Sequence, residues 1–198
     1  MISNISYYHI EQGVGKVFVP GLLRGYFNDL TGKRNWSGIV DKMGIPVCLL
    51  FDGSKTYFPT TIIQKALGHW DWYLLTNQKN ELDEFLKICE WLIKYQNKKG
   101  GWEIAGELLP GSTSHFSAMP QGEAISTLVR AWQVTSDGRF LEAATKAYRL
   151  LVTPLEQGGT SNYISGELFL EELPMVPKNT ILNGWIFALF GIYDFHLV

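Results

Sequence analysis

The segment LEELPMVPKNTILNGWIFALFGIYD, residues 170–194, joins two adjacent carboxylates and a proline to an almost wholly apolar run. Glu171 and Glu172 are separated from Pro174 by Leu173 alone, and the run that ends at Asp194 has the length and composition of a helix. A helix that is apolar on most sides is buried among other elements. The sequence therefore predicts polar chemistry at the mouth of a buried helix, with the rest of the chain as its scaffold.

The composition is that of one globular domain. The 198 residues suffice for a sizeable core, and 46% of them are hydrophobic and 18% charged. The formal net charge of −2 argues against a nucleic-acid-binding protein, which usually has a basic face. An acidic substrate is compatible with this charge, because a local cationic pocket can exist within a nearly neutral total.

The cysteines and the N-terminus bear on the compartment. Cys48 and Cys89 do not make a disulfide framework or a zinc site, and Cys89 falls on the apolar face of a predicted helix, which predicts a buried free thiol. The first four residues contain no charged region that leads into an apolar run, and no run reaches membrane-spanning length. We therefore expect a cytoplasmic protein without a membrane span.

The pattern changes at residue 59. Upstream, short apolar or alternating pieces are separated by Gly and Pro, which predicts a β-rich N-terminal segment over residues 1–58; the pieces are residues 5–10, 16–19, 45–51 and 56–58. From Pro59 onward apolar residues recur at helical spacing. Pro120 fits a first helical turn and Asp137 an N-cap. We therefore expect this segment to pack on a helical domain over residues 59–198.

The predicted helices repeat about every 60 residues, with two helices and two loops in each unit. The first helix of each unit is apolar all round and the second has one apolar face, as in the inner and outer helices of a toroid. The expected fold is mainly α: an incomplete α/α toroid of αα-hairpin repeats. The third unit has only its inner helix. We therefore expect a domain truncated at its C-terminus, or a homo-oligomer such as a dimer that covers Trp185, Ile186, Leu189 and Phe190.

Three blocks together resemble the C-terminal domain of the D-glucuronyl C5-epimerases, the heparosan and heparan sulfate enzymes. The blocks are Tyr57 to His69, Gly100 to Ala131 and Glu171 to Asp194, and the second and third are long and specific. The resemblance implies an α/α-barrel domain that inverts C5 of glucuronate within an acidic polysaccharide, giving iduronate. This chemistry takes a base for the C5 proton, donors for the enolate charge and an acid on the opposite face. It requires no cofactor, and no glycine-rich dinucleotide-binding motif is present.

The resemblance also implies roles for single residues. Glu172 matches a glutamate that acts in catalysis, and Asn183 matches an asparagine that contacts the sugar. Leu173 stands where the family has a catalytic tyrosine. Phe187, a further substrate contact, stands where a tyrosine is frequent. The family's remaining catalytic tyrosines belong to a segment further toward the C-terminus than this chain extends.

The residue types alone suggest two further substrate-binding candidates, Gln121 and Arg24. Gln121 and Asn183, together with Gln64, fall near the starts of three apolar helices, where an amide faces the lumen or is a satisfied core group. Arg24 can pair bidentately with a uronate carboxylate, as can Arg130, and for both the alternative is a structural salt bridge. For Glu172 the alternative is an acid favoured by a helix dipole, and Glu171 is expected to be structural or solvated.

Three other functions fit parts of the sequence. Residues 96–102 match the Q-x-x-x-G-x-W repeat of terpene cyclases, but the aspartate-rich motif of those enzymes is not found. A glycoside hydrolase or uronate lyase on the same toroid would use Glu171, Glu172 or Asp71 as its carboxylates. A non-catalytic epimerase-like domain would bind acidic glycan or pair with another chain, and the substitution at Leu173 favours it.

Overall fold

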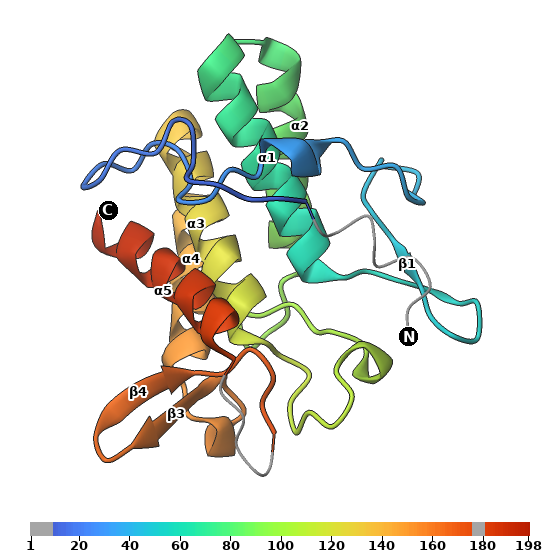
Figure 1. Cartoon of the computed structure of the whole chain (residues 1–198), viewed down its shortest axis with the longest axis vertical. Helices are drawn as coiled ribbons and strands as arrows, with labels where there is room; N and C mark the ends of the chain where they lie inside the picture. Colours follow the sequence, from blue (N-terminus) through green and yellow to red (C-terminus); the bar gives the residue numbers. More distant parts are fainter. Residues whose placement is uncertain (1–9, 176–180) are drawn as a thin grey trace. The chain divides into compact units, whose positions relative to one another are not determined.

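The structure is a computed structural model that describes residues 10–175 and 181–198 (Figure 1). The chain forms two compact units, one within residues 1–90 and the other within residues 91–198. The predicted boundary between residues 58 and 59 stays a prediction.

The first unit begins with turns and little regular strand. Strands β1 (Cys48–Leu49) and β2 (Lys55–Thr56) pair antiparallel, and a 3-10 helix, η2, covers Thr31–Arg34. The expected β-rich segment is thus reduced to one short pair within residues 10–58. Residues 16–19 are turn and coil, and residues 5–9 lie outside the described part. The interruptions by Gly and Pro explain this, because the backbone groups there bond within loops, as Gly15 N does to Phe27 O at 2.8 Å.

Helix α1 (Pro59–Thr76) is the core of this unit. Pro59 occupies its first position, and its residues are buried from Pro59 to Asp71. Gly68 allows the chain before η2 to approach closely, since a Cβ there would lie 2.4 Å from the carbonyl oxygen of Leu30. Helix α2 (Lys79–Tyr95) follows and packs on α1 through Trp70 and Phe85, whose ring centroids are 5.1 Å apart.

A buried cluster of titratable side chains joins η2, α1 and α2. Lys65 Nζ lies 2.9 Å from the carbonyl oxygen of Arg34 and 2.8 Å from His69 Nε2, and His69 Nδ1 lies 2.6 Å from Glu81. Because an amino group only donates here, Nε2 accepts and Nδ1 carries the hydrogen that it donates to Glu81. Burial, with the Lys65 charge, holds the pKa of His69 below its usual range. His69 is thus a buried, partnered histidine.

The second unit is built around α3 (Ala118–Thr135). Helix α4 (Gly138–Val152) and helix α5 (Leu182–His196) both pack on α3 (Figure 1). The backbones of α3 and α5 nearly touch at three small residues: a Cβ on Gly122 would lie 2.5 Å from Ala188 Cα, and one on Gly191 would lie 2.2 Å from the Gly122 oxygen. A larger residue at this crossing would force the two helices apart.

A buried ion pair locks the far end of the same crossing. Arg130 Nη1 lies 2.5 Å from one oxygen of Asp194, and Nη2 lies 3.3 Å from the other. The two side chains are 1% and 2% exposed, and Nη1 also donates to the Ser126 carbonyl oxygen at 2.8 Å. Arg130 therefore has the structural role that was the alternative to carboxylate binding.

A β-hairpin that the sequence did not predict lies at the end of the unit where α5 begins (Figure 1). Strands β3 (Ser161–Ile164) and β4 (Glu167–Leu170) pair antiparallel, with Ser161 opposite Leu170. The two-residue turn, Ser165-Gly166, has positive φ at both positions, as a type I′ turn requires. Because β4 leads directly into Glu171, the hairpin sets where the carboxylate pair starts.

The two helical hairpins that the sequence predicts are both present, and they close through the same turn. Asn77 after α1 and Ser136 after α3 each have a φ near +55° and donate their N–H to the residue four before, both at 2.7 Å. Thr76 and Thr135 each donate a hydroxyl hydrogen to the carbonyl oxygen four residues back. The starts of α1 and α3, residues 59 and 118, are 59 residues apart, which agrees with the predicted repeat.

The structure thus gives a mainly helical protein with five α-helices and two small two-stranded sheets within the described residues. None of these helices combines the length and the apolar character that a membrane crossing requires. Cys89 is fully buried as a free thiol, as predicted.

Candidate functional site around Glu172

Backbone hydrogen bonds fix the segment that carries the two carboxylates. Glu171 donates its N–H to the Thr160 carbonyl oxygen at 2.9 Å and accepts one from Ala118, the first residue of α3, also at 2.9 Å. Three residues on, the Pro174 carbonyl oxygen accepts the N–H of Thr113 at 2.7 Å. The backbone on both sides of residue 172 is therefore held by three other parts of the second unit.

Glu172 lies against the first turn of α5. A Cβ built on Gly184, the third residue of that helix, would lie 2.1 Å from Glu172 Oε2 and 2.4 Å from Glu172 Cβ. Such separations are too short for real atoms, so only glycine at position 184 allows the carboxylate to lie here. The first turn of a helix exposes unbonded N–H groups and the positive end of the helix dipole. The carboxylate thus occupies a place that favours negative charge.

Burial nevertheless makes the Glu172 carboxyl a weaker acid than usual. Burial raises the pKa of Glu172, and the nearby N–H of Gly184 lowers it by less, so the net shift is upward. Among the described residues, no donor meets hydrogen-bond geometry at the buried Oε2 atom. A carboxyl with a raised pKa and an unsatisfied oxygen holds its proton to higher pH than an ordinary glutamate, which suits a general acid or base.

Two aromatic residues belong to the elements on either side of Glu172 in the sequence, β4 before it and α5 after it. Trp185 follows Gly184 on α5, and its ring stacks on Phe169 of β4 with centroids 5.2 Å apart. The Trp185 Nε1 atom is buried and has no partner among the described residues. Sequence reasoning did not select Trp185 as a site residue, although its place directly after the Asn-Gly pair at the helix start is a usable signal. A flat ring with a free N–H next to a carboxyl suits a sugar.

The other predicted residues of this unit lie at different depths. Asn183 is exposed as the second residue of α5, and Phe187 is half-buried one turn on, with its ring edge toward Phe190 at 5.9 Å between centroids. Gln121 is fully buried on α3, where Nε2 donates to the Gly100 carbonyl oxygen at 3.4 Å. Asn183 and Phe187 therefore share a helix start with Glu172, whereas Gln121 belongs to the core of α3.

The three amides noted in the sequence do not occupy equivalent helix positions. Gln64 is the sixth residue of α1, Gln121 the fourth of α3 and Asn183 the second of α5. Gln64 and Gln121 are buried, but Asn183 is exposed. The repeat is therefore a repeat of helices and turns, and it does not make these amides one set.

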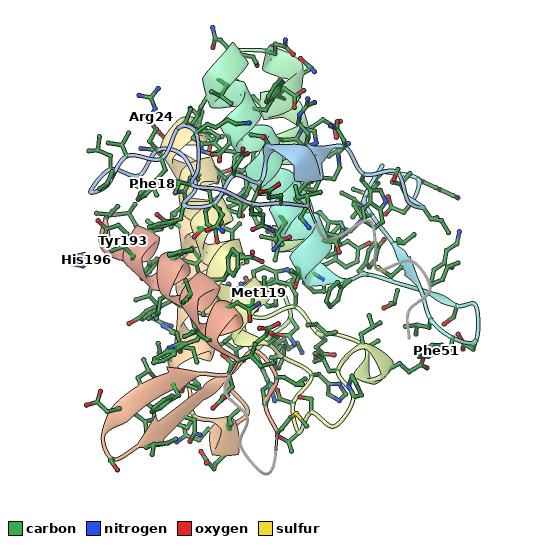
Figure 2. The ribbon with its side chains drawn as sticks, in the orientation of Figure 1. Phe18, Arg24, Phe51, Met119, Tyr193 and His196 are labelled. Carbon is green, nitrogen blue, oxygen red and sulfur yellow. The ribbon has the colours of Figure 1, made fainter. Side chains whose placement is uncertain are left out.

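Arg24 lies in the first unit, in the loop before η2. Its side chain is exposed (Figure 2), and its carbonyl oxygen accepts the Trp70 Nε1 hydrogen at 2.8 Å. This bond shows a structural role for the backbone of Arg24. Its role in binding a carboxylate stays a prediction.

Glu171 and Leu173 lie on either side of Glu172 in the sequence, and their surroundings differ from those of Glu172. Glu171 is 2% exposed, and the Asn162 amide lies 3.5 Å from its carboxylate, so this residue is structural, one of the two alternatives that the sequence allowed. Leu173 is half-buried. Across residues 10–175 and 181–198, no group of three or more His, Cys, Asp or Glu side chains is placed to hold a metal ion.

The fold and site define a helical-hairpin domain with a protonatable glutamate seated at a helix start, and comparison with known proteins identifies the class. Residues 94–197 match the family described as D-glucuronyl C5-epimerase C-terminus. The chain belongs to this family, which confirms the resemblance found in the sequence.

One curated relative is a D-glucuronyl C5-epimerase from Caenorhabditis elegans. It is 36% identical over 119 residues, which cover 56% of this chain and 19% of the relative. The chain therefore spans about a fifth of the length of the curated relative that it matches. Glu172, Asn183, Phe187 and Gln121 all lie within the residues that the family covers.

Proposed function

We propose that this chain takes part in the C5 epimerisation of glucuronate within an acidic, heparosan-like polysaccharide, with Glu172 as a catalytic acid or base. The observation that carries the proposal is the half-buried Glu172 side chain against the first turn of α5, with its Oε2 atom buried and its pKa raised by desolvation. The family of residues 94–197 supports the reaction class. The whole activity is a proposal, because the chain spans 19% of its epimerase relative.

The reaction explains why such a carboxyl is useful. The C5 proton lies next to the uronate carboxylate, so its removal places negative charge on an enolate-like group. As a base, Glu172 takes this proton in its charged form; as an acid, it returns a proton in its neutral form. A pKa raised toward the working pH serves both roles. The positive end of α5 stabilises nearby negative charge in either case.

A second candidate function is non-catalytic binding of acidic glycan. Leu173 and Phe187, in places where the resemblance leads us to expect tyrosines, favour it, since neither side chain can exchange a proton. Under this proposal the Glu172 carboxyl only seats the start of α5 and the flanking residues Asn183 and Trp185 contact the sugar.

We extend this proposal to the arrangement of the helices and to the association of the chains. The repeated turn after α1 and α3 supports an α/α toroid, in which α5 is a third inner helix. Helix α5 carries an exposed apolar stripe of Leu182, Ile186, Leu189 and Tyr193, with exposures of 64%, 40%, 42% and 40%; Figure 2 labels Tyr193 near the end of the helix. This stripe supports association as a homo-oligomer such as a dimer, which light scattering with a Leu182→Ser, Leu189→Ser variant would test.

Incubation with heparosan in heavy water tests the epimerase proposal. We expect deuterium at uronate C5, measured by NMR of the recovered polymer, and loss of this exchange in Glu172→Gln with glycan binding kept. Glu167→Gln, which neutralises an exposed carboxylate on β4, is the matched control and should exchange normally. Shortened chains or an unsaturated uronate would instead indicate a hydrolase or lyase. Binding without exchange in the parent chain would support the non-catalytic function.

A further inference from the structure

A hollow of about 320 Å³ lies between the carboxyl end of α2 and the exposed face of α4. Ile93 and Ala143 give it an apolar floor. Gln96 ties its two walls together, because its Nε2 donates to the carbonyl oxygens of Gly100 at 3.0 Å and Ala143 at 2.8 Å. The floor is therefore fixed by hydrogen bonds, and the hollow shares no residue with the site around Glu172.

Three cationic side chains line this hollow. Lys98 belongs to the loop after α2, and Arg139 and Lys146 lie on α4. Residues 139 and 146 are seven positions apart, so they lie on one face of the helix about 10 Å from each other. Glu142 stands between them and pairs with Lys146 at 2.7 Å. Asp137, which is not one of the lining residues, pairs with Arg139 at 2.7 Å. Three cations and these two carboxylates leave a net charge of +1 at the hollow.

The surrounding charge is segregated in the same way. Of the seven described Lys and Arg residues within 91–198, Arg130 is buried against Asp194. The other six are exposed and all belong to α2, the loop after it or α4: Lys94, Lys98, Lys99, Arg139, Lys146 and Arg149. The acidic end of the unit, with Glu167, Glu171 and Glu172, contains none of them. Within the described part of the second unit, the exposed cations are therefore gathered around the end of α2 and on α4, with Asp137 and Glu142 among them.

We propose that this hollow is a second binding site for an anionic polysaccharide, in which the cations hold carboxylates of sugars remote from the reacting one. The proposal rests on the proposed function, since it takes the same class of polymer. The distance between residues 139 and 146 is of the order of the separation of successive charges on a chain in which uronate alternates with another sugar. An apolar floor beneath cations suits the mixed faces of a sugar ring. The site would hold a long chain on the protein between reaction events.

The test compares two variants with equal changes in charge. One carries Lys98→Gln, Arg139→Gln and Lys146→Gln. The matched control carries Lys42→Gln, Lys55→Gln and Lys79→Gln, three exposed lysines of the first unit. All six side chains are exposed, so both variants should keep the circular dichroism of the parent. Affinity for immobilised heparosan polymer and for a short heparosan oligosaccharide is measured at low and physiological ionic strength.

We expect the hollow variant to bind the polymer at least about tenfold more weakly, with a shallower salt dependence, and the control to change by about twofold or less. The proposal is overturned by undiminished affinity, by an equal loss in the control, or by polyglutamate competing as well as the polymer. The proposed function fails separately: it fails if the parent chain exchanges no C5 hydrogen, whatever the binding result. Conversely, normal C5 exchange with undiminished affinity in the hollow variant overturns only the second site.

Discussion

Replacement of Gly184 by alanine tests whether the seat of Glu172 on α5 matters for the reaction. A Cβ at this position would lie 2.1 Å from Glu172 Oε2 and 2.4 Å from Glu172 Cβ. Contacts between such atoms are favourable only above about 3.5 Å, so the glutamate side chain has to move by about 1 Å or more. A displacement of this size at a reacting group costs roughly 100-fold in rate.

The same substitution has the opposite effect on the helix itself. Alanine in a helix is favoured over glycine by about 0.5–1 kcal/mol. The clash with Glu172 Cβ can be relieved only by a shift of the backbone, so we expect Gly184→Ala to lose stability, with the gain in helix propensity offsetting part of the loss. A large loss of exchange under conditions where the variant is still folded would therefore come from the position of the carboxylate.

Two measurements test the predicted effect of Gly184→Ala. Deuterium incorporation at C5 should fall by roughly 100-fold, and in the Glu172→Gln background Gly184→Ala should add almost nothing. Carboxyl NMR titration should show the pKa of Glu172 move back toward its ordinary value, because the displaced group is less buried; this readout does not depend on activity. Ile186→Ala, on the exposed face of α5, is the control and should leave both unchanged. Exchange close to that of the parent, or an equal loss in the Gln background, would refute the reasoning.

Three further predictions concern stability. Because the pKa of Glu172 is raised in the fold, the charged carboxylate lowers the unfolding free energy when the pH is above that pKa. This destabilisation disappears when the pH falls below the pKa of Glu172 in the unfolded chain. Glu172→Gln should therefore raise the unfolding free energy at pH ~7.5 and lose this advantage near pH ~4, as denaturant titrations would show. Asp194→Asn leaves the Arg130 charge buried without its partner, so we expect a loss of about 3–5 kcal/mol by the same assay, largely recovered by Arg130→Met with Asp194→Leu. The pKa of His69 is lowered in the fold, so as the pH falls below about 6.5 the imidazole becomes protonated in the unfolded chain before it does in the folded chain. The unfolding free energy therefore declines with falling pH in this range. His69→Gln should flatten this decline, and an unchanged dependence of the unfolding free energy on pH would contradict the neutral, buried histidine.

Helices were predictable here because their signals are local. Pro59 starts α1 and Asp137 caps α4, where its Oδ1 accepts the N–H of Arg139 at 3.0 Å. Asn80 followed by Asp83 also has the pattern of an N-cap with its reciprocal acid, but α2 already begins at Lys79. Strands are harder to predict: residues 16–19 form no strand, whereas strands β3 and β4 form around the Ser165-Gly166 turn. Strand formation depends on a partner, and no local pattern supplies one.

The candidate site was only partly predictable for the same reason. The start of α5 and the carboxylate pair before it follow from local sequence. The raised pKa of Glu172, the closeness of Gly184 and the stack of Phe169 on Trp185 do not, because they arise from contacts between separate segments. Arg130 illustrates the converse: only its buried partner Asp194, 64 residues away, reveals that it is structural.

The backbone anchors of Glu171 and Pro174 have a consequence for the order of folding. The bond from Thr113 to Pro174 joins residues 61 positions apart, and those from Glu171 reach Ala118 and Thr160. Helices and hairpins form early because their contacts are local, whereas such distant contacts close late. We therefore expect a partly folded chain to form helices before these contacts close, with Glu172 still solvated. The proton affinity of this one carboxyl thus reports that tertiary assembly is complete.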